Sequence, residues 1–335
     1  MNTGTFLFVF LLIRAEINLR KLEEPTMKKM ISAILTVAML LSVCCCFTGC
    51  GGDDGAYTVG ICQLMEHESL DQATQGFIDA LTAEMSAAGK TVNFDTQVAG
   101  DSNLCATVVN TFTAKKVDLI MANATPALLN AANATTSIPV LGTSVTDYAD
   151  TFAGNIPANV SGTSDAVPFD EQAKMMIESL KLVPGDVVGV LYCTNESNSL
   201  IQYEAVKALF EAEGIVVEAY TFSETTELQA LTTSMASKVK AVYIPSDNTV
   251  AQNDAIVGTI CTEQNVPVYT SYGGAICYAS LSISYYDLGT ETGKMAAEIL
   301  LNGKNPSDIA IATLTPSVSY NEDLCAQLGI EVPAN

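Results

Sequence analysis

The sequence predicts an α/β fold in which two doubly wound lobes each contain a parallel sheet. The chain has 335 residues, enough for about two domains with separate cores. From Tyr57 onward, short segments rich in β-branched residues alternate with amphipathic ones, a pattern typical of parallel sheets covered by helices. The series then recurs, so that Gly60 corresponds to Gly189 and Pro139 to Pro267. A repeat of this length indicates two copies of one lobe rather than a solenoid.

The first lobe begins with a strand and a helix that local signals delimit. The segment YTVGICQL predicts a strand over 57–64. A capping box over 69–72 predicts the start of a helix, which Gly89 ends. Further strands and helices then alternate: strands over 91–99, 117–124 and 138–144, with helices near 103–115 and from Pro126.

The second lobe repeats this order after a helix with Pro168 in its first turn. Its strands are predicted over 187–196, 215–223, 239–246 and 266–272, with helices over 203–214 and near 225–237. A final helix over 290–301, ended by Gly303, has no strand series of its own. We therefore expect the chain to cross back there and complete the first lobe.

The first 50 residues are predicted to be a targeting segment. Lys28 and Lys29 precede an apolar run over 31–47, which is typical of an export signal. The ending Phe-Thr-Gly-Cys resembles a bacterial lipobox and predicts lipidation of Cys50, followed by a flexible tether over 51–56. The alternative is a retained spanning helix, although the run is short for one. Met27 is the expected start of translation, which makes residues 1–26 an upstream extension.

Composition excludes several classes of function. A net charge of −22 repels phosphate backbones, so no nucleic acid is expected as a partner. The chain has one histidine, and its last arginine is Arg20, which leaves no means to build most hydrolytic triads, His-rich metal sites or arginine clamps. Neither GxGxxG nor GxSxG occurs at the expected places. We expect no enzyme activity, no cofactor and no metal.

Six cysteines follow Cys50, and an even number permits disulfides. There is no CxxC among them, and most stand in apolar runs that read as strands or helices. We therefore expect mostly reduced thiols that pack as small apolar side chains.

The carboxyl ends of the strands predict where a ligand binds, because open parallel sheets bind ligands there. The segments after the strands are rich in short polar side chains, and helix N-termini at this edge offer free N–H groups to an anion. The candidate ligand-binding residues are Gln63, Met65, Glu66, His67, Thr125, Pro126, Thr143, Ser144, Asn198, Ser199, Asp247, Asn248 and Tyr272.

Five segments together resemble a known family over nearly all of residues 57–333: VGICQLMEHESLDQATQGF, DLIMANATPAL, VSGTSDAVPFDEQ, VYIPSDNTV and YYDLGTETGKMAAEIL. They resemble the ABC-transporter substrate-binding lipoproteins of the tryptophan/tyrosine-import type. The resemblance implies the type I periplasmic-binding fold, with two lobes joined by a three-crossing hinge. The first lobe would comprise 57–162 and 283–311, and the second 163–282 and 312–335.

The resemblance also implies that an aromatic amino acid is captured between the lobes and delivered to a permease. With no arginine available, the ligand carboxylate would need hydroxyl groups, for which Thr125, Thr143 and Ser144 are candidates. Asp247 would hold the ammonium, and Met65 and Tyr272 would form a wall for the side chain. The alternatives are that the hydroxyls are helix N-caps, that Asp247 is a turn residue and that Met65 and Tyr272 pack within their lobes. His67 is expected to contact the ligand or cap a helix.

The expected partners are a small-molecule ligand, the transmembrane subunits of an ABC permease, and the membrane through a lipid on Cys50. The chain is expected to act as a monomer on the extracytoplasmic face of the cell membrane. The competing function is a receptor of the same fold for a branched-chain amino acid, a sugar or a nucleoside. A sugar receptor would usually line its cleft with several arginines, aspartates and asparagines, and no arginine follows Arg20.

Overall fold

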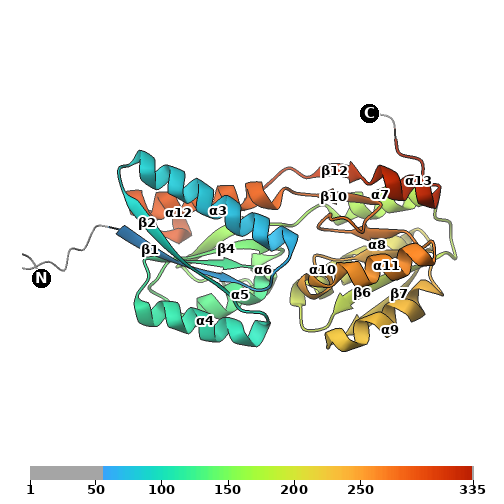
Figure 1. Ribbon diagram of the computed structural model, residues 1–335, viewed down its shortest axis with the longest axis horizontal. Helices are drawn as coiled ribbons and strands as arrows, with labels where there is room; N and C mark the ends of the chain where they lie inside the picture. Colours follow the sequence, from blue (N-terminus) through green and yellow to red (C-terminus); the bar gives the residue numbers. More distant parts are fainter. Residues whose placement is uncertain (1–55, 334–335) are drawn as a thin grey trace, which may run out of the picture. The chain divides into compact units, whose positions relative to one another are not determined.

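Two six-stranded sheets form the framework of the computed structural model, which describes residues 56–333 (Figure 1). The first sheet has the order β11-β5-β4-β3-β1-β2, and the second has the order β12-β10-β9-β8-β6-β7. The two orders correspond strand for strand, which confirms the predicted pair of α/β lobes. The strands are β1 Ala56–Gln63, β2 Thr91–Val98, β3 Leu119–Asn123, β4 Val140–Val145, β5 Val160–Ser164, β6 Val187–Cys193, β7 Val216–Phe222, β8 Ala241–Ile244, β9 Val268–Thr270, β10 Ala279–Ser282, β11 Ala312–Thr313 and β12 Ser317–Tyr320.

Helices cover both faces of each sheet. In the first lobe, α3 and α12 pack on one face and α4 and α5 on the other. In the second lobe, α9 and α11 lie on one face and α7, α8 and α13 on the other. The helices are α3 Glu68–Ala87, α4 Ser102–Lys115, α5 Thr125–Ala134, α6 Tyr148–Thr151, α7 Phe169–Leu180, α8 Ser197–Ala212, α9 Thr225–Ala236, α10 Asn248–Gln252, α11 Asp254–Glu263, α12 Tyr285–Asn302 and α13 Glu322–Leu328, with a short 3₁₀ helix at Pro306–Asp308.

Strand β1 shows why both faces of the sheet are covered. Val59 and Ile61 pack with α3 and α12, whereas Cys62 belongs to the cluster under α4 and α5. All three side chains are fully buried. A strand buried on both faces needs apolar residues at successive positions rather than at alternate ones, which is the pattern of the segment VGIC.

The chain crosses between the lobes three times, at 165–168, 283–284 and 314–316. Two of the expected lobe boundaries are therefore too early by two residues. Strand β5 continues to Ser164, and Thr313 in β11 pairs with Ser164 in the first sheet. The boundary after residue 282 coincides with the end of β10.

A wholly parallel second sheet had been expected, and this is wrong for one strand. Strand β12 pairs antiparallel with β10. The connections explain the direction. Strand β10 leads out of the second lobe, and β12 begins directly after the third crossing leads back in. Neighbouring strands that leave and enter at the same end of a sheet must run in opposite directions.

The predicted capping box over 69–72 is wrong, because α3 begins at Glu68 with His67 as its N-cap residue. The backbone N–H of Asp71 already bonds to the carbonyl of His67 at 3.0 Å, which closes the first turn earlier. In the second lobe, α8 likewise begins at Ser197, ahead of the predicted start at residue 203.

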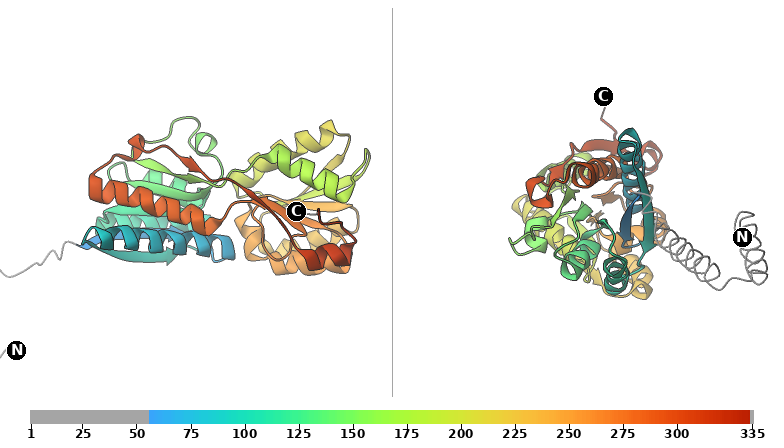
Figure 2. Two further views of the ribbon diagram at one scale, coloured as in Figure 1. Left: turned by 90° about the horizontal axis from the view of Figure 1, so that it is seen from above. Right: turned by 90° about the vertical axis from the view of Figure 1, so that its left-hand side faces the viewer.

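Helices α3 and α12 lie side by side in the first lobe, although about 200 residues separate them in the chain (Figure 2). Two glycines permit this close approach. A Cβ atom at Gly289 would lie 1.9 Å from the carbonyl oxygen of Ala73, and one at Gly76 would lie 2.1 Å from that of Tyr286. The last helix therefore completes the first lobe, as the sequence predicts.

The six described cysteines, Cys62, Cys105, Cys193, Cys261, Cys277 and Cys325, are all buried and none forms a disulfide. All of them except Cys277 belong to apolar clusters of the two lobes. This agrees with the expectation of reduced structural thiols.

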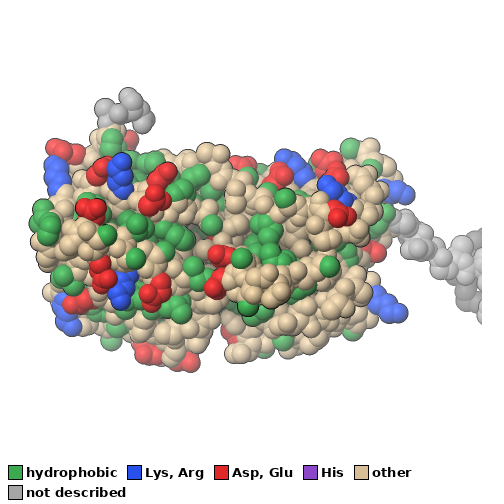
Figure 3. All heavy atoms as spheres, turned by 180° about the vertical axis from the view of Figure 1, so that it is seen from behind, with side chains coloured by type: hydrophobic (Ala, Val, Ile, Leu, Met, Phe, Trp, Pro, Cys, Tyr) green, Lys and Arg blue, Asp and Glu red, His purple; other side chains and the backbone are tan. Residues whose placement is uncertain are grey.

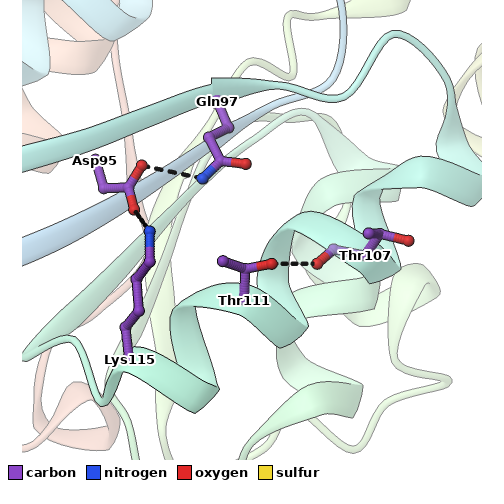
Figure 4. Close-up of polar contacts among 5 residues, drawn as sticks. All are labelled: Asp95, Gln97, Thr107, Thr111 and Lys115. Carbon is purple, nitrogen blue, oxygen red and sulfur yellow. Dashed lines mark hydrogen bonds and ion pairs between the residues drawn. The ribbon is translucent and has the colours of Figure 1, made fainter.

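Most charged side chains lie on the surface, and several of them pair locally. Lys115 at the end of α4 contacts Asp95 on β2 at 2.6 Å, and Asp95 also accepts a hydrogen bond from Gln97 (Figure 4). The hydrogen bond from Lys115 lowers the pKa of Asp95. Exposed pairs of this kind contribute about 0–1 kcal/mol, so they add little to stability.

Acidic side chains are scattered over the face shown in Figure 3, with lysines among them rather than in one contiguous positive patch. This distribution is unsuited to a polyanion. Among the described residues, no helix is both long and apolar enough to cross a bilayer. The predicted signal, Cys50 and most of the tether lie outside the described residues.

Candidate functional site

A cavity between the two lobes collects side chains from the carboxyl ends of both sheets. Only about 10 Å³ of this space can hold the centre of a water molecule. Small-ligand sites usually span roughly 300–1,000 Å³, so the lobes must separate to admit a ligand. The lining residues are His67, Ser69, Leu70, Ser144, Asp165, Ser246, Asp247, Asn248, Ala251, Tyr272 and Tyr285.

Contacts across the cavity hold the lobes together. The Nε2 atom of His67 lies 3.2 Å from the Oδ1 atom of Asn248. Gln202 on α8 donates to the hydroxyl of Thr146, just after β4, at 3.3 Å. Each contact joins a residue of one lobe to a residue of the other, so the structure has its lobes closed against each other.

Ser144 occupies an irregular position near the end of β4. The register with β5 shifts between Gly142 and Val145, and Ser144 adopts a positive φ of 56°. A non-glycine residue in this region costs about 1–3 kcal/mol and is often found at ligand sites. The side chain is buried, and its Oγ atom has no hydrogen-bond partner among the described residues.

Asp165 follows β5 directly and is 6% exposed. Its Oδ2 atom accepts a hydrogen bond from the hydroxyl of Tyr285 at 3.0 Å, whereas its Oδ1 atom has no partner in the described residues. Burial raises the pKa of Asp165, and the hydroxyls of Thr146 and Tyr285 partly oppose that rise. The cavity therefore contains a carboxylate oxygen that accepts no hydrogen bond from the described residues.

In the second lobe, a different carboxylate fixes the start of α10, where Asn248 lines the cavity. Glu196, 2% exposed, accepts hydrogen bonds from the backbone N–H groups of Asn248 and Thr249 at 2.9 and 2.8 Å. It also accepts from the side chains of both residues, at 2.6 and 2.7 Å. Glu196 thus satisfies the free amides at the start of α10, which the sequence had suggested as an anion site.

Asp247 is also committed to its own lobe. Its carboxylate accepts hydrogen bonds from Cys193 N at 2.7 Å, Ser199 Oγ at 2.8 Å and Val250 N at 2.9 Å. Burial raises the pKa of Asp247, and the neighbouring negative charge of Glu196 raises it further. Asp247 lines the cavity, but it first serves as the N-cap of α10.

Two tyrosines and the single histidine complete the lining. The hydroxyl of Tyr272 is buried and lacks a partner within the described residues, and so does the Nδ1 atom of His67. Burial raises the pKa of Tyr272. Burial lowers the pKa of His67, and its hydrogen bond to Asn248 and the charges of Glu196, Asp71 and Asp254 partly oppose this.

The structure brings together five of the thirteen candidate residues around the cavity: His67, Ser144, Asp247, Asn248 and Tyr272. Glu66 lies in an adjoining outer groove, together with His67 and Tyr272. Gln63 bonds to Thr74 and Asp71 within its lobe, and Thr143 accepts from Thr163. The other candidates outside the lining are Met65, Thr125, Pro126, Asn198 and Ser199.

Six lining residues were not among the candidates predicted from the sequence. Asp165 and Tyr285 are the most important of them, because they bring a carboxylate and a phenol to the cavity. Asp165 stands immediately after a strand, so the strand-end rule that selected Ser144 would have selected it too. No strand was predicted over β5, so the residue after it was not selected. Tyr285 was not among the candidate residues either. The others are Ser69, Leu70, Ser246 and Ala251.

A larger surface groove of about 820 Å³ lies on the second lobe, where α7 meets Tyr320 and Glu331. None of its residues has a buried polar atom without a partner. Across residues 56–333, no three His, Cys, Asp or Glu side chains lie close enough together to hold a metal ion. The inter-lobe cavity is therefore the better candidate for a ligand site.

Comparison with known proteins agrees with this architecture. The family model described as "ABC transporter substrate binding protein" matches residues 58–335. A curated relative, the tyrosine-binding protein of Clostridioides difficile (strain R20291), is 31% identical over 330 residues, which cover 91% of this chain and 93% of the relative.

Solved structures give the same result. An ABC domain from Streptococcus pneumonia in complex with L-Trp is 31% identical, with a TM-score of 0.74 over 82% of this chain and 96% of that chain. A ligand-free, open substrate-binding protein with adhesive properties from Clostridium difficile is 34% identical, with a TM-score of 0.63 over 83% and 97% of the two chains.

A glucose-galactose binding protein from Geobacillus stearothermophilus shares the fold at 14% identity and a TM-score of 0.59, over 80% of this chain and 99% of that chain. The two lobes thus have the type I periplasmic-binding fold. With a family model that matches nearly all of the described residues, the chain belongs to the ABC transporter substrate-binding protein family.

Proposed function

We propose that this chain is an extracytoplasmic receptor that binds an aromatic amino acid between its lobes and delivers it to the permease of an ABC importer. One observation carries the proposal. Four residues that line the inter-lobe cavity have a buried polar atom without a partner in the described residues: His67, Ser144, Asp165 and Tyr272. Such atoms are costly unless a ligand satisfies them, and a zwitterion with an aromatic side chain offers the matching groups.

The contacts favour Asp165, rather than Asp247, as the partner of the ligand ammonium. All the oxygens of Asp247 already accept hydrogen bonds from the second lobe. Asp165 has one oxygen bonded to Tyr285 and one without a partner in the part of the chain that the structure describes. A buried carboxylate gains most from a cation where no other donor is available.

The N-terminus of α3 is the best place for the ligand carboxylate. The first three N–H groups of a helix have no partner within the helix, and Ser69 and Leu70 of this first turn line the cavity. At α10 the equivalent groups already bond to Glu196 and Asp247. The hydroxyl of Ser144 supplies a further donor from the same lobe, so no arginine is needed.

The lining residues and the relatives support an aromatic side chain. Tyr272 and Tyr285 line the cavity and are both less than 10% exposed, and tyrosine rings stack well on aromatic ligands. Relatives at about 31% identity are named for tyrosine binding or were solved with L-Trp. The TM-score is higher for the Trp complex than for the open, ligand-free relative, which supports closure of the lobes over the ligand.

We also propose that a lipid on Cys50 anchors the receptor, acting as a monomer, at the extracytoplasmic face of the cell membrane. The export-signal pattern before Cys50 and the glycine-rich tether after it support this arrangement. A tethered receptor stays near its permease, which raises its effective concentration there.

Calorimetry of the purified protein should detect binding of L-tyrosine, L-tryptophan or L-phenylalanine. We expect the best of these to bind at least about 100-fold more tightly than leucine, galactose or uridine, because about 3 kcal/mol separates a filled site from a poorly filled one. Tight binding of leucine, galactose or uridine, with no measurable heat from any aromatic amino acid, would replace this function with the competing one.

Asp165→Asn should weaken binding of the best aromatic amino acid about 30- to 5,000-fold, because removing one member of a buried charged pair costs about 2–5 kcal/mol.

Asp165→Asn should also stabilise the ligand-free protein. A raised carboxyl pKa means that the folded state holds the proton more tightly, so this contribution to stability is lost as pH rises through the folded-state pKa. The thermal unfolding midpoint of the variant should exceed that of the wild type at about pH 7.5 but not at about pH 3.5.

Asp147→Asn is the matched control for this variant. Asp147 caps α6 through a hydrogen bond from Asp150 N, and asparagine caps a helix as well as aspartate does. It removes one carboxylate near β4 without touching the cavity, so affinity should stay within about threefold. If Asp165→Asn also binds within threefold of the wild type, Asp165 does not hold the ammonium.

Cys50→Ala should release the protein from the membrane fraction and abolish metabolic labelling with a fatty acid. The thiol is the only group at this position that can take the lipid, and one acyl anchor contributes about 0.8 kcal/mol per buried CH₂. Fractionation and labelling of cells that express each form measure both effects. A variant that remains membrane-bound and uncut would instead indicate a retained spanning helix.

A further inference from the structure

The hydrogen bonds around Asn248 show that the Nε2 atom of His67 carries a proton. The side-chain nitrogen of Asn248 donates to Glu196 Oε2 at 2.6 Å, so its oxygen is the atom that faces His67. An amide oxygen only accepts hydrogen bonds. The Nε2 atom of His67, 3.2 Å away, must therefore carry the proton.

With the proton on Nε2, the Nδ1 atom of a neutral ring carries only a lone pair. Burial keeps the ring neutral by lowering the pKa of His67, despite the acidic groups of Glu196, Asp71 and Asp254 around it. The Nδ1 atom is buried and accepts no hydrogen bond from the described residues. It is not used as a helix cap either, although His67 is the N-cap residue of α3.

We propose that His67 Nδ1 selects the ligand by accepting a hydrogen bond from a donor on its aromatic side chain, the O–H of a phenol or the N–H of an indole. This inference rests on the proposed function, because it assigns a residue of the same cavity to discrimination among aromatic amino acids. Tyrosine and tryptophan have such a donor and phenylalanine has none. Phenylalanine therefore leaves the buried acceptor without a partner.

The size of the preference follows from that unpaired acceptor. Leaving a buried acceptor unsatisfied typically weakens binding by about 10- to 100-fold. Sites that hydrogen-bond a substrate group reject analogues without it more strongly than apolar pockets reject an extra atom. The chain Glu196–Asn248–His67 spans both lobes, so the acceptor is correctly placed only when the lobes close.

The test uses pairs of ligands that differ in the donor alone. Calorimetry on the purified full-length protein would compare L-tyrosine with L-phenylalanine and para-fluorophenylalanine, and L-tryptophan with benzothienylalanine, in which sulfur replaces the indole N–H. We expect the better of the two donor-bearing ligands to bind about 10- to 100-fold more tightly than its donor-free partner.

Two variants assign this preference to His67. His67→Leu removes the acceptor but keeps the bulk, so the preference should fall to within about threefold while phenylalanine still binds. His67→Asn places an oxygen close to the position of Nδ1 and should restore part of the preference. The unfolding midpoint of each variant confirms that it is folded before binding is measured.

A wild-type protein that binds both members of each pair within threefold overturns the inference, even if neither variant folds. So does a His67→Leu protein that keeps the full preference. Equal loss of all aromatic ligands in His67→Leu also overturns it, because Nδ1 would then contact the shared ammonium. These outcomes leave the proposed function intact, whereas a wild-type protein that binds no aromatic amino acid contradicts the function itself.

Discussion

Three carboxylates buried at the lobe junction, with no arginine to neutralise them, set the constraint on which the site depends. Asp165, Glu196 and Asp247 are at most 6% exposed, and the ion pairs of the described residues involve none of them. Neutral donors must therefore satisfy them, which costs less when each oxygen has a partner. Glu196 and Asp247 are satisfied within the second lobe. The remaining unmatched charge lies at Asp165, which suits a ligand with one compact cation.

The two-lobe architecture distributes recognition over both halves of the molecule. In the proposed arrangement the first lobe supplies the N-terminus of α3 and Ser144 for an anion, and the first crossing supplies Asp165. The second lobe supplies Tyr272 and holds Asn248 against His67. A ligand that contacts both lobes binds the closed state better than the open one and so shifts the population toward it. Closure and recognition would thus draw on the same contacts.

Most of the fold could be predicted from the sequence, because strand–helix alternation and a long repeat are enough to specify two parallel sheets. About half of the cavity lining could also be predicted, because the ends of parallel strands converge. The rest depends on contacts that no local pattern reports. Glu196 accepts hydrogen bonds from the first amides of α10, although it lies about 50 residues earlier in the chain. Both carboxylate oxygens of Asp247 accept hydrogen bonds from the second lobe. Strand β5 was missed because its small polar residues read as a connection.

A crystal structure of the protein with L-tyrosine would test this binding arrangement. We expect the amino acid to lie between the lobes, with its ammonium nitrogen within about 3 Å of Asp165 Oδ1. Its carboxylate should meet the N-terminus of α3, and its phenol should face His67 Nδ1. A ligand bound outside the inter-lobe cavity, or one whose ammonium contacts Asp247 and leaves Asp165 without a partner, would overturn this arrangement.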